Sequence, residues 1–132
     1  MKKELIRYRR ERAKGTLEEA KIVFENKKLF ATVNRIYYAI FYEVVALLLT
    51  KDLSSSKHSG VRGLFNKEFV KNGIVPEELG EFYNKLFEFR QRGDYEDFVE
   101  FEETQVKQWL TQAESFIDTV DKIIEKIMKR KK

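Results

Sequence analysis

The feature that most constrains the fold is the spacing of apolar residues in the last part of the chain. From Glu102 to Met128, apolar side chains recur at steps of three or four residues. An α-helix with 3.6 residues per turn places such residues on one face, whereas a strand would need strict alternation. The segment therefore predicts one long amphipathic helix with a single buried face.

Similar patterns predict three more long helices and one short helix. The long helices are expected at Lys3–Asn26, at Phe30–Thr50 and from Pro76 to near Gly93. The short helix follows a polar loop, with Ser59 as its N-cap and Asn72-Gly73 at its end. The sequence thus predicts an all-α fold, an antiparallel up-and-down helical bundle of four long helices plus one short helix. A single domain over residues 1–132 is expected from this length.

Missing residue types and motifs exclude several kinds of chemistry. The chain has no cysteine and one histidine, which excludes disulfides, thiol nucleophiles and multi-histidine metal sites within one chain. Its six glycines fall in neither of the common phosphate-binding loop motifs. We therefore expect no cofactor and no metal. Glu43 interrupts the longest apolar stretch, Ile36–Leu49, which is too short to cross a bilayer, so we expect a cytoplasmic protein without a membrane partner.

The charges are distributed unevenly along the chain. Residues 1–28 hold ten Lys/Arg against five Asp/Glu, and residues 122–132 hold six against one. Residues 77–103 hold three basic and ten acidic residues. In an up-and-down bundle the two basic segments meet at one end. That end suits the phosphate backbone of RNA, and it is equally explained as a pair of solvated chain ends.

An unusual polar stripe lies in the apolar second segment. Arg35, Tyr38 and Tyr42 fall on one helical face, at positions i, i+3 and i+7. A buried arginine needs a carboxylate, a carbonyl or a phosphate, because an uncompensated charge is costly there. The stripe therefore either pairs with a glutamate of a neighbouring helix or contacts RNA or a nucleotide.

Two further places hold candidate functional residues. Arg90 and Arg92 stand just before the expected end of the fourth helix, and Tyr95 follows them. Guanidinium groups can clamp phosphate through paired hydrogen bonds, so both arginines are candidate RNA-binding or nucleotide-binding residues. His58 lies just before the short helix, where backbone N–H groups could hold an anion, although a lone loop histidine is commonly solvated.

Taken together, three ordered segments resemble the HEPN domain family, and the resemblance covers roughly residues 5–125. The segments are Asn34–Tyr42 (NRIYYAIFY), Lys57–Phe65 (KHSGVRGLF) and Phe89–Tyr95 (FRQRGDY). The resemblance implies an up-and-down helical bundle that forms a homodimer. Many members are metal-independent RNases, often toxins paired with a minimal nucleotidyltransferase antitoxin, and others bind RNA or nucleotides without cleaving them.

The sequence departs from this family at its catalytic signature, an arginine followed after four to six residues by a histidine. Arg90 matches the arginine, but Tyr95 stands where the histidine could first occur, and His58 lies far upstream of Arg90. A phenol with a pKa of about 10 is a poor general base at neutral pH. The leading hypothesis is a module that binds RNA or a nucleotide and acts with a nucleotidyltransferase. The alternatives are an endoribonuclease in which Arg90, Tyr95 and His58 are catalytic, and a noncatalytic dimerisation scaffold.

Overall fold

The computed structural model describes residues 2–95 and 99–130, and all regular structure in these ranges is helical. The all-α prediction is therefore confirmed, and the long helices begin and end within two residues of their expected positions. The elements are α1 (Lys2–Glu25), α2 (Leu29–Leu49), α3 (His58–Phe65), the π-helical turn η1 (Asn66–Val70), α4 (Glu77–Tyr95) and α5 (Glu103–Arg130).

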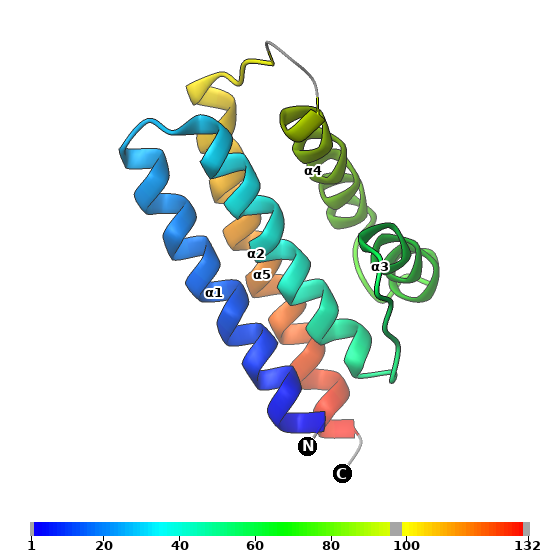
Figure 1. Cartoon of the computed structure of the whole chain (residues 1–132). Coiled ribbons are helices and arrows are strands. Elements are labelled where there is room, and N and C mark those ends of the chain that lie inside the picture. The colour runs from blue at the N-terminus through cyan, green and yellow to red at the C-terminus, as the bar shows by residue number, and fades with distance from the viewer. Residues whose placement is uncertain (1, 96–98, 131–132) are drawn as a thin grey trace.

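The long helices alternate in direction, as an up-and-down bundle requires (Figure 1). Helix α2 packs against α1, α4 and α5, and α1 also packs against α5. The start of α1 and the end of α5 lie at the same end of the molecule, so the basic residues at these two helix ends lie near one another (Figure 1). Helix α3 and η1 lie beside the start of α4 and connect it to α2.

Helix α2 forms the centre of the core because apolar residues cover more than one of its faces. Ile36, Ile40, Val44 and Leu47 are completely buried. By length and composition alone, the whole of α2 is long and apolar enough to cross a membrane. It is longer than Ile36–Leu49, the apolar stretch judged too short to cross a bilayer from the sequence. Most of its surface is buried inside the bundle, as in the core helix of a soluble protein. A cytoplasmic location without a membrane partner stays a prediction.

The start of α3 differs from the prediction. Ser59 was expected as the N-cap, but α3 begins at His58, and Lys57 occupies the N-cap position without a side-chain hydrogen bond. In the preceding loop, the Ser55 hydroxyl accepts a hydrogen bond from the Lys57 backbone N–H at 3.2 Å. The predicted turn at Gly73 is present, and its φ of +81° is a conformation that favours glycine.

The end of α4 also differs from the prediction. The helix continues through Gly93 to Tyr95, since one glycine costs a helix only about 1 kcal/mol relative to alanine. Arg90 and Arg92 therefore lie inside the helix and not beside a turn. At the other end of α4, Gly80 allows a close approach to η1, because an added Cβ would lie 3.0 Å from a Val70 methyl group.

Candidate functional site

The middle of α2 carries a tyrosine that gathers side chains from α3 and α4. Tyr37 is completely buried, and its ring and hydroxyl contact both His58 and Arg90. Tyr38 and Phe41 from the same helix complete the surroundings and are partly exposed. We refer to these five residues as the Tyr37 site.

The ring of His58 is held on several sides. Its Nδ1 atom lies 2.9 Å from the Tyr37 hydroxyl, which is a hydrogen-bond distance. Its plane stacks on Phe41, with 4.3 Å between centroids and 11° between planes. Tyr38 meets it edge to face at 5.6 Å. These contacts fix the orientation of an imidazole that is still partly exposed to solvent.

Arg90 reaches the same tyrosine from α4. Its guanidinium carbon lies 4.9 Å from the centroid of the Tyr37 ring and 5.8 Å from that of Tyr38, both within cation–π range. Arg90 and His58 thus meet on one aromatic ring within a single chain. Because they lie far apart in the sequence, no local motif reveals the pair.

The protonation states follow from burial and from the guanidinium group. Burial, and then the charge of Arg90, lower the pKa of His58, so the imidazole is neutral at pH 7. Burial raises the pKa of Tyr37 to about 12, so its hydroxyl keeps its proton. The Tyr37 site at neutral pH therefore combines a cationic guanidinium with an uncharged imidazole and an uncharged phenol.

A second set of residues supports the Tyr37 site from α3 and α4. The Arg62 guanidinium carbon lies 4.1 Å from the centroid of the Phe87 ring. Tyr83 stacks beside Tyr37 at 6.1 Å, and burial raises the pKa of the Tyr83 hydroxyl. That hydroxyl lies near the one of Tyr37 without the geometry of a hydrogen bond. Sequence reasoning gave no site role to Tyr37 or Arg62, and their only signal was their place in two of the family-like segments.

The predicted stripe on α2 divides between two neighbours. Arg35 donates to Glu19 at 3.2 Å and to the Asn34 side-chain oxygen at 2.9 Å. Arg35 therefore pairs with a glutamate of a neighbouring helix, which is one of the two alternatives left open by the sequence. The Arg35 guanidinium carbon also lies 5.3 Å from the centroid of the Tyr38 ring, which links it to the edge of the Tyr37 site.

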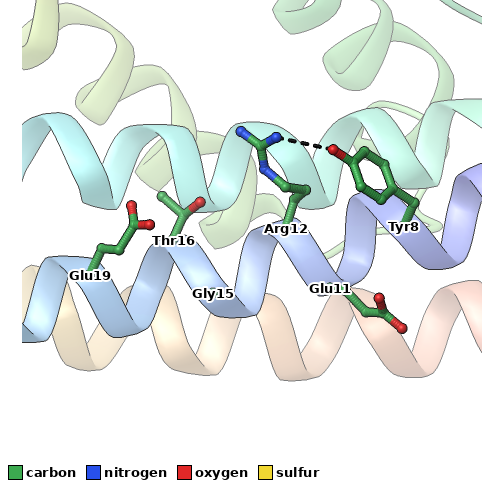
Figure 2. A pocket seen from close by; sticks show the side chains of 6 residues that line it. All are labelled: Tyr8, Glu11, Arg12, Gly15, Thr16 and Glu19. Atoms are coloured by element: carbon green, nitrogen blue, oxygen red, sulfur yellow. Dashed lines mark hydrogen bonds between the residues drawn. The ribbon is translucent and has the colours of Figure 1, made fainter.

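Tyr42 belongs to the α1 side of the stripe. Its hydroxyl accepts a hydrogen bond from Arg12 at 2.8 Å, and Arg12 also donates to the Tyr8 hydroxyl at 3.2 Å. Figure 2 shows Arg12 directed toward Tyr8 in a shallow pocket that Gly15 and Glu19 also line. Tyr42 thus contributes to the packing of α1 against α2, while its ring touches that of Tyr38 at 6.2 Å.

The remaining predicted residues lie near the end of α4. Arg92 is exposed, and its guanidinium carbon lies 5.8 Å from the centroid of the Phe89 ring. Tyr95 is the last residue of α4, and its side chain lies outside the part that the structure describes. Of the predicted residues, the structure joins Arg90, His58 and Tyr38 and places Arg35 and Tyr42 beside Tyr38. Arg92 contacts the ring of Phe89.

A separate polar cluster lies where α1, α2 and α5 meet, and we call it the Asp121 cluster. Asp121 binds Arg10 at 2.7 Å and Lys14 at 3.0 Å, and Glu43 is completely buried beside it. Burial, followed by the adjacent carboxyl group of Asp121, raises the pKa of Glu43 to about 10. A protonated Glu43 can donate to Asp121, whereas two carboxylates would offer only acceptors. In the described ranges, no three His, Cys, Asp or Glu side chains are grouped to hold a metal ion.

Comparisons with known proteins agree with this architecture, a small helical bundle. A family model described as HEPN domain matches residues 6–124. A UPF0332 protein of Thermotoga maritima is 56% identical over 124 residues, which is 94% of each chain. "Putative toxin MJ0605" of Methanocaldococcus jannaschii is 39% identical, over 88% of this chain and 86% of that protein. "Putative toxin MJ0142" of the same organism is 34% identical, over 90% and 85%.

The chain belongs to the HEPN domain family. The family resemblance of the three sequence segments is thereby confirmed. Its relatives include proteins named as toxins, so the chain is a toxin-related HEPN module.

Proposed function

We propose that this HEPN module binds RNA at the Tyr37 site, with Arg90 on a phosphate and His58 beside it. The observation that carries the proposal is the meeting of Arg90 and His58 on the ring of Tyr37. A guanidinium group forms strong, charge-assisted hydrogen bonds with phosphate oxygens. The partly exposed rings of Tyr38 and Phe41 suit stacking with an unpaired base, which favours single-stranded RNA over a duplex.

The test compares two arginines of α4 that lie two residues apart. Arg90→Ala should weaken binding of a labelled single-stranded RNA at least about tenfold at low salt, the effect of losing a good bidentate contact. Arg92→Ala is the matched control, because Arg92 is exposed and contacts Phe89. It should change affinity by much less. Equal losses in both variants, measured by fluorescence anisotropy, would point to a diffuse cationic surface and contradict the proposal.

A second candidate function is cleavage of the bound RNA by the same residues. It is favoured by the position of His58, which supplies next to Arg90 the histidine that the sequence motif lacks. The assay incubates labelled RNA with the protein in the presence of EDTA. Cleavage that is lost in both His58→Ala and Arg90→Ala supports the nuclease. Intact RNA with retained binding leaves the binding module as the function.

The module is also proposed to act as a homodimer. Support comes from large apolar side chains that the bundle leaves exposed. Four lie on α1 and at the start of α2, namely Leu5, Tyr8, Ile22 and Phe30, and the fifth in the described ranges is Ile74. Ile22 alone is 58% exposed, and such residues often mark contacts between proteins. Light scattering should give twice the chain mass. A particle with the mass of a single chain at micromolar concentration would contradict the dimer.

A nucleotidyltransferase antitoxin is the proposed protein partner. The support is membership of the HEPN family together with relatives that are named as toxins. A toxin needs a neutralising partner, and a small nucleotidyltransferase encoded by the neighbouring gene would be the candidate. Co-expression should then yield a stable complex and relieve any growth defect. A growth defect that persists in the presence of that partner would contradict the pairing.

A further inference from the structure

The hydrogen bond between Tyr37 and His58 determines which imidazole nitrogen of His58 carries the proton and which can accept one. It is the one hydrogen bond that the His58 side chain makes to the described part of the chain, and it uses Nδ1. A neutral imidazole has one N–H donor and one acceptor nitrogen. If Nδ1 accepts, Nε2 carries the proton, and if Nδ1 donates, Nε2 is a base. The direction of this bond therefore separates anion binding from proton abstraction.

The buried hydroxyl of Tyr37 settles the direction. A buried O–H without an acceptor costs about 1 to 3 kcal/mol, so the Tyr37 proton must reach an acceptor. The other nearby oxygen, that of Tyr83, is buried and forms no hydrogen bond with any residue in the described ranges. Nδ1 of His58, at 2.9 Å, is the acceptor within reach.

We infer that Tyr37 is a positioning residue that donates to His58 Nδ1 and holds the ring as its Nε2–H tautomer, which offers a second hydrogen-bond donor beside Arg90. The inference rests on the proposed function only in naming RNA as the source of the anion. Phe41 and Tyr38 add the steric part, because they fix the plane of the same ring. Arg90 and the Nε2–H group then form a donor pair for one phosphate.

This arrangement favours binding of RNA over its cleavage by a histidine base. An Nε2 atom that carries a proton cannot accept one from a ribose hydroxyl. A phosphodiester or a free phosphate, in contrast, accepts hydrogen bonds from both Arg90 and Nε2–H. The site would hold its ligand without activating a nucleophile at this nitrogen.

The ionisable neighbours of the ring come from three helices. Tyr37 and Tyr38 face it from α2, Arg90 lies near it from α4, and Arg62 of α3 acts on Tyr37. A donor to Nδ1 stabilises the neutral ring, as does the nearby guanidinium charge. Removing the Tyr37 hydroxyl should therefore raise the pKa of His58.

The experiment is ¹⁵N NMR of the imidazole in the full-length protein. The chain has one histidine, so its ring signals need no assignment. The wild-type protein above pH 7 should show a protonated Nε2 and an accepting Nδ1. Tyr37→Phe should mix the two tautomers and raise the His58 pKa. Tyr38→Phe is the control, because Tyr38 touches the same ring without a hydrogen bond to it, and should leave both unchanged.

A protonated Nδ1 in the wild-type protein would overturn the inference. Added inorganic phosphate should perturb the Nε2–H signal in the wild-type protein but not in Arg90→Ala, and no response in either would also overturn it. An imidazole with a protonated Nδ1 in a protein that binds RNA through Arg90 refutes the inference and leaves the proposed function intact. An Nε2–H ring that responds to phosphate in a protein that does not bind RNA supports the inference and refutes the proposed function.

Discussion

Helix α2 contributes one buried polar residue to each of two very different clusters. In the Asp121 cluster, Glu43 lies beside an acid that is bound by Arg10 and Lys14, so opposite charges meet inside the protein. In the Tyr37 site, the contacts are of another kind. A phenol bonds the histidine, and Arg90 lies against aromatic rings.

The difference is between a cluster whose charges pair with one another and a site whose contacts are largely aromatic. Ion pairs that close on themselves hold α1 to α5, and an external ligand would find their charges already matched. An aromatic ring attracts a cation without carrying the opposite formal charge. The ring contacts of Arg90 with Tyr37 and Tyr38 are therefore of another kind than the ion pairs of the Asp121 cluster.

The largest expected effect comes from removing the acid of the Asp121 cluster. Asp121→Ala would leave Arg10 and Lys14 without their shared partner and would remove the carboxyl group beside the buried Glu43. The free energy of unfolding should fall by about 3 to 5 kcal/mol, as for other buried pairs that lose one member. Urea unfolding measures it.

Glu125→Ala is the control for this change, since Glu125 binds the same Arg10 from an exposed position. It should cost less than about 1 kcal/mol. If Asp121→Ala cost no more than Glu125→Ala, the Asp121 cluster would not be a structural tie. The RNA affinity of the folded Asp121→Ala protein should equal that of the wild type, because the Tyr37 site is formed by other residues.

The next effect is a pH dependence of stability that Glu43 produces. The pKa of Glu43 rises from 4.5 to about 10 on folding, so the folded protein binds a proton that the unfolded chain releases. Its contribution to stability is full below pH 4.5 and is lost as the pH rises toward 10, by at most about 1.4 kcal/mol per pH unit. Glu43→Gln keeps a donor toward Asp121 and cannot titrate.

Urea unfolding of both proteins from pH 5 to pH 9 tests this dependence. The Gln variant should gain stability over the wild type steadily as the pH rises. Parallel curves for the two proteins would mean that Glu43 is ionised in the folded state. Glu43 could then not donate a hydrogen bond to Asp121.

Sequence patterns predicted the helices well because each helix depends on residues three or four positions apart. The stripe in α5 and the apolar faces of α2 are local facts, and the apolar neighbours of Arg35 indicated that it needs a partner. The Tyr37 site depends instead on contacts between α2 and two later helices, from Tyr37 to His58 and from Tyr37 to Arg90. No local spacing encodes these contacts. The family resemblance was the one sequence feature that linked the segments that contain these residues.

The two carboxyl groups at the centre of the Asp121 cluster, those of Glu43 and Asp121, were equally hard to interpret from the sequence. Glu43 was noted only as an interruption of an apolar stretch, although a carboxylate there signals a buried partner. Asp121 lies far along the chain from Glu43, and no local spacing links the two residues. The end of α4 was misplaced for a local reason, because Gly93 was given more weight as a helix terminator than a single glycine deserves.

A smaller effect concerns the unbonded hydroxyl of Tyr83. Tyr83→Phe removes a buried O–H that has no hydrogen-bond partner in the described ranges. The free energy of unfolding should therefore rise by about 1 kcal/mol or more, because an unsatisfied buried hydroxyl costs at least that much. The NMR signals of His58 should stay as in the wild type. A changed tautomer in this variant would mean that Tyr37 bonds to Tyr83, and the assignment of the Tyr37 proton to His58 would then be wrong.

The smallest effect separates Arg35 from Arg90. Both guanidinium groups lie against Tyr38, but Arg35 is also bound to Glu19, so part of its charge is matched inside the protein as in the Asp121 cluster. Arg35→Ala should change the free energy of unfolding by less than about 1 kcal/mol, since the pair is largely exposed. Its effect on RNA affinity should be well below that of Arg90→Ala, measured side by side by anisotropy. If the two variants lose affinity equally, the α2 stripe binds RNA along its length, and a matched charge does not keep an arginine out of a phosphate site.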